Sequence, residues 1–272
     1  MSLATIDLSA TGVVPERTDD ATVAYELVAR FGAAILVGNG REALDGPAVA
    51  HRVFEDHTLA VPEAAEVTDK GVHERRPEGL SNRTRSNCHT DGYSFGWQYP
   101  DHFLLLCDEP SDDGGDSFLV SGNAVLAAMA LDEELAWVAK CLANVSVDQT
   151  QAGMQPLIGP LVSTSPSGRQ MFVMANAVDQ RPTNDSTDPA RDREMIEAWR
   201  STVDAATDQV EHFKIDSGEA VIVDNYRLFH GREPYDDVRR RMWRVWTWTD
   251  SAAFGTPDAV LHSDSREAHF AG

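Results

Sequence analysis

The stretch that decides the fold is Ser217–Arg232, which has the sequence SGEAVIVDNYRLFHGR. Its apolar run at 221–223 predicts a buried strand, and a short turn then leads to His230. We expect a neighbouring strand to present the His230 side chain. The segment therefore predicts a sheet that carries a candidate functional histidine.

The rest of the chain predicts one sheet-rich core with helical supports, because strands dominate its middle and end while helices cluster early and late. Further strands are expected at Ala33–Val37, His89–Phe95, His102–Cys107, Ser117–Val120, Val145–Ser165, Gln170–Ala177, Gln209–Ile215 and Arg239–Thr249. Apolar spacing predicts helices at 19–31, Pro47–Leu59, Ala124–Cys141 and Pro189–Asp208. Without an internal repeat or a clear linker, we expect a single domain over residues 1–272, with helical N-terminal support at about 18–60 and a candidate lid loop at 61–87.

Composition excludes several classes of function. The 272 residues include 23 Lys and Arg against 44 Asp and Glu, a formal charge of −21, which repels nucleic-acid phosphates. No apolar run approaches the roughly 20 residues that span a bilayer, and the N-terminus lacks the pattern of a signal peptide. We therefore expect no nucleic-acid or membrane partner; the sequence does not predict the oligomeric state.

The three cysteines are Cys88, Cys107 and Cys141, an odd set without CxxC spacing. This pattern argues against a disulfide framework or a thiolate zinc site and favours a reducing cytoplasm. Each cysteine is expected to be a small buried hydrophobe, with nucleophilic catalysis by Cys88 as the less favoured alternative.

The motif His89-Thr90-Asp91-Gly92 places an imidazole and a carboxylate two residues apart. On a strand, His89 and Asp91 would project from the same face and could chelate a metal. An HxD pair alone often occurs by chance, but His230 would complete two histidines and one carboxylate on one side of an ion. That set leaves open positions, as in non-haem Fe(II) oxygenases. Structural or surface roles are assigned to His51, His57, His73, His102, His212, His262 and His269.

Arginines interleave with aromatic and apolar residues in Arg239–Thr249, with the sequence RRRMWRVWTWT. Strand alternation places Arg240 and Arg244 on one face and Arg241 on the other. A guanidinium grips a carboxylate through parallel hydrogen bonds, so an acidic protein with arginines here is expected to bind a small carboxylate. The alternative is a basic edge strand that prevents aggregation.

Four ordered segments resemble the taurine dioxygenase and clavaminate-synthase-like family of Fe(II)- and 2-oxoglutarate-dependent oxygenases. They are HTDG, GGDSFLVSG at Gly114–Gly122, Ser217–Arg232, and RRMWRVWTWTD at Arg240–Asp250. The similarity runs from about Asn87 to Asp250 and is specific for the superfamily but weak for any substrate. It implies a mainly β fold with flanking helices, a double-stranded β-helix or jelly roll with the metal at its mouth.

The resemblance places His89, Asp91 and His230 on the family's iron ligands. It implies Fe(II), 2-oxoglutarate and O2 as cofactors, and release of succinate and CO2. Halogenating relatives replace the ligand carboxylate with a small residue. The presence of Asp91 therefore favours hydroxylation, or a desaturation, epoxidation or cyclisation variant.

The resemblance also implies how 2-oxoglutarate is held. Arg240 falls on the arginine that binds the far carboxylate, and Arg244 lies two same-face steps further along, with Arg241 as the alternative register. Ser117 stands where relatives often have a threonine hydroxyl that contacts the same carboxylate. The serine keeps the hydroxyl.

The primary substrate is expected to be a small polar molecule, such as an amino acid or a natural-product intermediate. Tyr93 and Phe95 continue the inward parity of the metal motif and are candidate pocket residues; core packing is the alternative. Arg85, with Arg75, Arg76 and Arg83, could hold a substrate carboxylate or phosphate; a solvated loop is the alternative. Two other classes remain: a cupin-like metal-dependent isomerase or hydrolase without 2-oxoglutarate, and a non-catalytic 2-oxoglutarate-binding protein.

Overall fold

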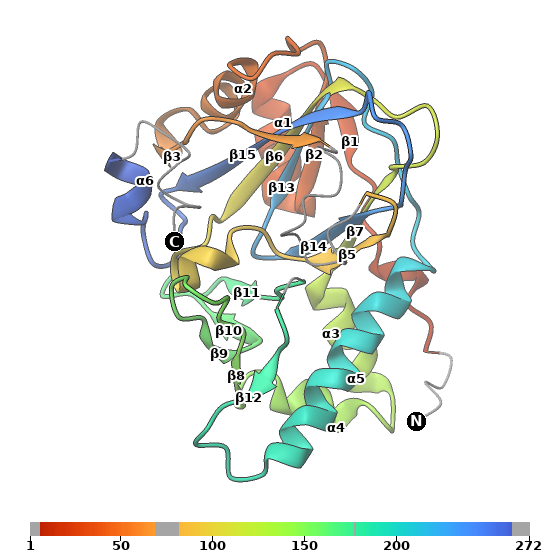
Figure 1. Cartoon of the computed structure of the whole chain (residues 1–272), viewed down its shortest axis with the longest axis vertical. Coiled ribbons are helices and arrows are strands. Elements are labelled where there is room, and N and C mark those ends of the chain that lie inside the picture. The colour runs from red at the N-terminus through yellow and green to blue at the C-terminus, as the bar shows by residue number, and fades with distance from the viewer. Residues whose placement is uncertain (1–5, 69–81, 177, 263–272) are drawn as a thin grey trace.

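The computed structural model describes residues 6–68, 82–176 and 178–262. Within these ranges two facing sheets form a sandwich, with helices outside it and a smaller helical and β region at one end (Figure 1). None of the described helices is long and apolar enough to cross a bilayer.

The larger sheet has seven strands in the order β1-β2-β13-β6-β15-β3, with β4 also pairing with β15. Its strands are β1 Glu16–Thr18, β2 Ala33–Leu36, β3 Thr58–Ala60, β4 Ala65–Thr68, β6 His102–Glu109, β13 Ala220–Asp224 and β15 Arg241–Thr249. Every residue of β13 is buried, because β2 and β6 flank it and both faces of the sheet are covered. The buried strand predicted at 221–223 is thus confirmed as a central strand.

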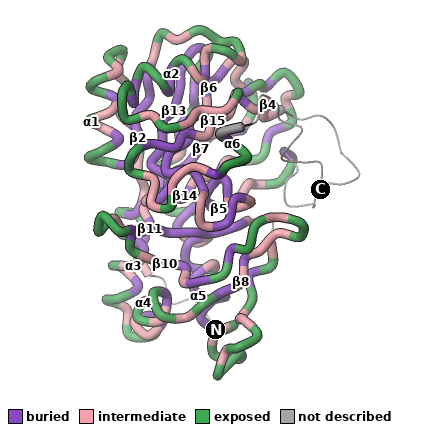
Figure 2. The backbone as a smooth tube through the Cα atoms, turned by 90° about the vertical axis from the view of Figure 1, so that its left-hand side faces the viewer, coloured by how far each residue is buried: buried purple, intermediate pink, exposed green. Residues whose placement is uncertain are grey.

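The smaller sheet has the order β5-β14-β7, from β5 Ser86–His89, β14 Leu228–Arg232 and β7 Ser117–Ser121. Its Leu119 and Leu228 pack in one apolar cluster with Phe103, Val221 and Met242 of the larger sheet. Buried residues accordingly follow the strands of both sheets, whereas α1 and α2 expose their outer faces (Figure 2). The two sheets therefore share the core that surrounds the candidate site.

Two helices cover the outer face of the larger sheet, α1 Ala21–Phe31 and α2 Asp45–Phe54 (Figure 1). Asp20 caps α1 by accepting hydrogen bonds from the backbone N–H groups of Thr22 and Val23. Gly32 ends the helix with a φ of 93°, which glycine adopts without steric cost. Both ends of the predicted helix at 19–31 are therefore explained by local chemistry.

The smaller region is organised around α5, Pro189–Thr207, which buries the predicted stripe of Met195, Trp199 and Val203. Its other elements are α3 Gly122–Leu131, α4 Ala136–Cys141, β8 Ser146–Asp148, β9 Ile158–Pro160, β10 Val162–Thr164, β11 Gln170–Phe172 and β12 Arg181–Pro182. The remaining elements are α6 Asp258–His262 and the 3-10 helices η1 Ser9–Thr11, η2 Glu55–His57 and η4 Tyr93–Gln98.

The predicted strand at His89–Phe95 is wrong beyond its first residue. Strand β5 ends at His89, Gly92 adopts a φ of 74°, and a 3-10 helix starts at Tyr93. The alternation of side chains along the strand therefore ends at His89, and Gly92, in the left-handed conformation that glycine adopts readily, leads into the 3-10 helix. The parity argument for Tyr93 and Phe95 therefore does not hold.

Three other boundaries differ from the sequence-based expectation. The segment 209–215 is not a strand; of it, only Phe213 forms an isolated bridge, to Ser117. The helix predicted at Pro47–Leu59 ends at Phe54, and the chain continues into η2 and β3. The helix predicted at Ala124–Cys141 divides in two where the Asp132 carboxylate accepts hydrogen bonds from the next turn's backbone.

The candidate lid loop at 61–87 is partly strand, because β4 pairs with β15 over Ala65–Thr68. Residues 69–81, which include His73, Arg75 and Arg76, lie outside the described residues, as does His269.

Gly231, next to His230, offers a test of how tightly the smaller sheet is packed. A Cβ at Gly231 would lie 2.3 Å from the carbonyl oxygen of Ser86 and 2.4 Å from the ring of Phe118. We expect Gly231→Ala to lower the free energy of unfolding by about 3 kcal/mol, because backbone and ring must both shift. Urea unfolding measures this loss.

Gly38→Ala is the control, since nothing lies within 4 Å of a Cβ there and only its positive φ of 74° is strained. That strain should cost about 1 kcal/mol. An equal loss in the two variants would contradict the close packing of β14.

Candidate metal centre

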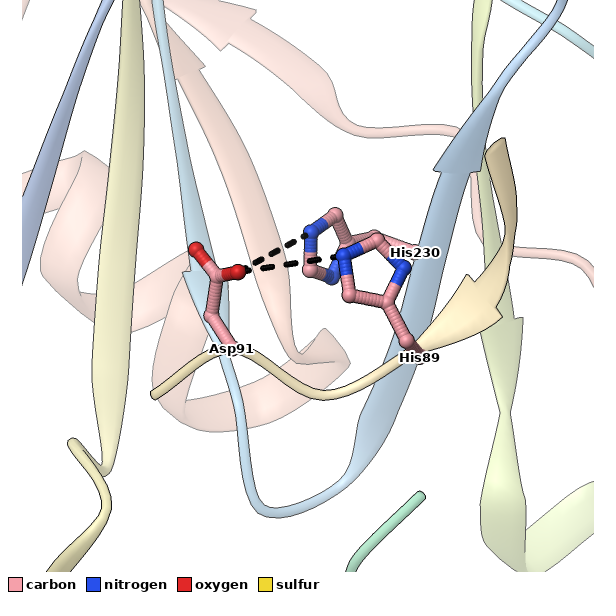
Figure 3. A group of neighbouring side chains, drawn as sticks. All are labelled: His89, Asp91 and His230. Carbon is pink, nitrogen blue, oxygen red and sulfur yellow. Dashed lines mark ion pairs between the residues drawn. The ribbon is translucent and has the colours of Figure 1, made fainter. Parts of the chain in front are cut away.

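Three side chains from two motifs converge at one end of the smaller sheet (Figure 3). His89 is the last residue of β5, and His230 lies directly opposite it in β14. Asp91 follows in the turn after β5. The predicted convergence therefore occurs, but the turn brings Asp91 inward, not strand alternation.

The spacing of the three groups fits one shared ion. Asp91 Oδ1 lies 3.8 Å from His89 Nε2 and 3.9 Å from His230 Nε2. Two donors that each lie about 2.1 Å from one ion can be at most about 4.2 Å apart. Within the described residues, this is the one group of three or more His, Cys, Asp or Glu side chains whose ligand atoms all lie within 4.8 Å of one another.

The histidines are in the form that binds a metal. His89 Nδ1 lies 2.9 Å from the carbonyl oxygen of Asn87, which can only accept, so Nδ1 carries the proton and Nε2 keeps its lone pair. Burial lowers the pKa of His89, and burial together with the neighbouring His89 lowers the pKa of His230 to about 3. Both imidazoles are therefore neutral near pH 7 and available as ligands.

Asp91 is an ionised carboxylate in a buried position. Burial, the largest single influence, raises its pKa, but Arg244, the two histidines and the hydrogen bond from Trp246 together outweigh burial, and the pKa lies below its ordinary value. Arg244 Nη1 lies 3.3 Å from Asp91 Oδ1, and the indole N–H of Trp246 donates to Asp91 Oδ2 at 3.0 Å. Sequence reasoning assigned no role to Trp246, although strand parity puts it on the face of Arg244.

Asn225 holds the backbone of Asp91. Its Oδ1 accepts from the N–H of Asp91 at 2.9 Å, and its Nδ2 donates to the carbonyl of Asp91 at 3.0 Å and to that of Pro100 at 2.7 Å. The side chain is fully buried. Asn225 belongs to the motif at 217–232, but the motif alone does not predict its role, because only the folded chain brings residues 91 and 225 together.

Of the two arginines predicted to share a face, Arg240 lies just before β15 and Arg244 lies within it. Arg240 is 5% exposed, and its guanidinium stacks on the ring of Tyr235 at 4.7 Å and lies against Gly115. It has no carboxylate partner among the described residues. Arg241 points to the other face and pairs with Asp108, so its side chain is already neutralised.

Arg244 and Ser117 are the other two residues predicted to bind 2-oxoglutarate. Arg244 Nε is buried and has no hydrogen-bond partner within the described part of the chain. Ser117 is 7% exposed at the start of β7, two residues after Gly115, the glycine against which Arg240 lies. Burying a charge without an anion is costly, so Arg240 favours a small anionic ligand.

The three candidate substrate residues each contact other side chains of the protein. Tyr93 donates a hydrogen bond to Asn176 Oδ1 at 3.4 Å. Phe95 packs edge-on against Trp246 and Trp248, which supports the alternative of a core aromatic. Arg85 pairs with the carboxylates of Asp208 at 2.6 Å and Glu233 at 2.8 Å, so its charge is already balanced.

Cys88 does not have the properties of a nucleophile. All three cysteines are free thiols. Burial raises the pKa of Cys88 to about 12, and only the thiolate is reactive. This supports the expected role of a small buried hydrophobe.

Comparison with protein families gives a match over most of the chain. The model of the taurine catabolism dioxygenase TauD, TfdA family matches residues 4–246. The chain belongs to this family. The resemblance drawn from the four sequence segments is thereby confirmed, and so is the predicted class of enzyme, a non-haem iron dioxygenase dependent on 2-oxoglutarate and O2. A search of curated protein sequences returned no match.

Solved structures with the same fold include PvcB of Pseudomonas aeruginosa, with a TM-score of 0.62 at 19% identity, covering 87% of this chain and 82% of that one. An asparagine oxygenase in complex with Fe(II), 2S,3S-3-hydroxyasparagine and succinate matches with a TM-score of 0.57 at 16% identity. The match covers 84% of this chain and 82% of that one. The non-haem iron oxygenase OrfP with Fe and alpha-ketoglutaric acid matches with a TM-score of 0.57 at 15% identity. The match covers 84% of this chain and 77% of that one. The predicted double-stranded β-helix is therefore confirmed.

Removing the Asn225 side chain should lower the stability of the protein strongly. Asn225→Ala leaves three buried backbone groups without partners, each worth about 1–3 kcal/mol, so we expect it to lower the free energy of unfolding by at least about 3 kcal/mol. Asn144→Ala is the control, because Asn144 makes one exposed hydrogen bond to the Lys140 carbonyl. Similar losses in urea unfolding would show that Asn225 does not anchor Asp91.

Proposed function

We propose that the chain, as one domain over residues 1–272, binds Fe(II) through His89, Asp91 and His230. In this proposal it hydroxylates an unactivated C–H bond of a small polar metabolite. One observation carries the ligand assignment: two neutral imidazoles face the same oxygen of one ionised carboxylate at 3.8 and 3.9 Å. Donors of this type suit ferrous iron, and their number leaves positions open for other ligands.

When bound, Fe(II) with 2-oxoglutarate and O2 supplies the oxidation: one oxygen atom enters succinate, CO2 leaves, and the other oxygen atom becomes the hydroxyl of the product. The chain's own residues orient the participants and balance their charges. The ionised Asp91 occupies one ligand position, which favours hydroxylation over halogenation.

The buried arginine supports 2-oxoglutarate as the co-substrate. A keto-diacid has a second carboxylate remote from its keto-acid end, and the Arg240 guanidinium is a buried cation without a carboxylate partner in the described residues. Two parallel hydrogen bonds to a carboxylate would satisfy it. A cupin-like isomerase or hydrolase would have no use for this buried charge.

An amino acid is the proposed substrate class, or a natural-product intermediate derived from one. The asparagine oxygenase structure contains hydroxyasparagine, structures of OrfP contain (3S)-hydroxy-L-Arg, and PvcB is described as an oxygenase from an isonitrile synthetic pathway. These proteins share the fold of this chain. The three free cysteines support the cytoplasm as its location.

The purified protein with Fe(II), 2-oxoglutarate and a panel of L-amino acids should consume O2 and form succinate, with at least one panel member stimulating turnover and gaining a hydroxyl group. His230→Ala should abolish succinate formation, because a ligand is lost. His57→Ala, an exposed histidine paired with Asp250, is the control and should keep full activity.

Succinate formation unchanged in His230→Ala would refute the site. Metal and 2-oxoglutarate binding without succinate formation under any condition would favour the non-catalytic alternative.

Arg240→Ala should raise the 2-oxoglutarate concentration needed for half-maximal turnover. Losing a charge-assisted hydrogen bond costs about 1.5–3 kcal/mol, which corresponds to roughly 10- to 150-fold. Arg241→Ala is the matched control, since the neighbouring arginine faces the other way. If Arg244→Ala alone shows the effect, then Arg244 holds the far carboxylate.

A further inference from the structure

The two oxygens of the Asp91 carboxylate have different surroundings. Oδ1 faces both imidazole Nε2 atoms and lies 3.3 Å from Arg244 Nη1. Oδ2 accepts the indole N–H of Trp246 at 3.0 Å. The carboxylate is therefore turned so that only one oxygen is directed at the two histidines.

Trp246 is itself held firmly. Its backbone pairs with Phe103 in the β15–β6 ladder, and the Phe103 ring lies 4.2 Å from the ring of His230. Its indole packs edge-on against Phe95 at 5.4 Å, and the Arg244 guanidinium lies 4.5 Å above it. A donor fixed by contacts of this kind can fix the orientation of its acceptor.

We propose that Trp246 is a positioning residue that makes Asp91 a one-oxygen ligand, an inference that rests on the proposed iron site. Without the indole, the carboxylate can rotate and present both oxygens to the ion, which would take up one of the positions that 2-oxoglutarate and O2 require. An indole N–H can only donate, so it holds Oδ2 without competing for the metal. Trp246 touches no reacting atom.

Trp248 provides a matched control on the same face of the same strand. It also packs edge-on against Phe95 at 5.4 Å, and its indole N–H donates to the Gln98 carbonyl at 2.8 Å. Removing either indole thus deletes one hydrogen bond and the same packing partner. Only Trp246 touches the metal ligand.

The experiment compares Trp246→Phe and Trp248→Phe for Fe(II) affinity without O2 and for the visible absorption of the Fe(II)–2-oxoglutarate complex. Loss of a hydrogen-bond partner of a metal ligand typically weakens metal affinity roughly 10- to 100-fold, which we expect for Trp246→Phe. The absorption band should shift in that variant alone. Trp248→Phe should keep Fe(II) affinity within about twofold of the parent, although its stability should fall. Equal changes in the two variants, or an unchanged Trp246→Phe, would overturn the proposal.

Two further arms keep the outcome unambiguous. If Trp246→Phe does not fold, benzothienylalanine placed at 246 or 248 preserves the ring shape but replaces the N–H with sulfur, and the same contrast is expected. Asp91→Ala separates the two proposals: if it retains full Fe(II) affinity, the iron site itself is wrong. If it loses affinity while the Trp246 variants do not, only the positioning role is wrong.

Discussion

The pairing of His230 with His89 across β14 and β5 is the constraint on which the metal centre depends. Antiparallel neighbours lie about 5 Å apart, so the ladder itself brings two imidazoles from segments 141 positions apart in the sequence (230 − 89 = 141) within reach of one ion. The sheet in turn requires Gly231, where the backbone approaches Ser86 too closely for a side chain. Backbone hydrogen bonds of the ladder thus bring the two histidines together.

Asp91 lies beyond the end of β5, so contacts other than the strand ladder must hold it in position. The Asn225 amide binds its backbone on both sides, and Trp246 and Arg244 bind its two carboxylate oxygens. All three residues come from β15 or from the turn after β13, so the larger sheet positions Asp91 and the smaller sheet positions the two histidines. The site exists only where the two sheets meet.

This strongly acidic chain has positively charged arginines in and next to its candidate site. A protein with a formal charge of −21 buries Arg240 just before β15 and directs Arg244 of β15 at Asp91. The outward Arg241 is neutralised by Asp108, whereas Arg240 has no acidic partner in the described residues. In a strongly acidic chain carboxylates are abundant enough to pair a buried cation, so the unpaired Arg240 supports the proposed binding of 2-oxoglutarate.

Local sequence was sufficient for the central strand at 221–223, the capped helix at 19–31, the two faces of β15 and the identity of the three metal-binding candidates. Each depends on side-chain periodicity or on the chemistry of neighbouring residues. The tertiary structure alone decided that Gly92 turns the chain after His89, that Arg85 is spent on Asp208 and Glu233, and that Asn225 and Trp246 hold Asp91. The contacts of Arg85, Asn225 and Trp246 join residues more than 100 positions apart, and no local pattern shows which distant groups a fold brings together.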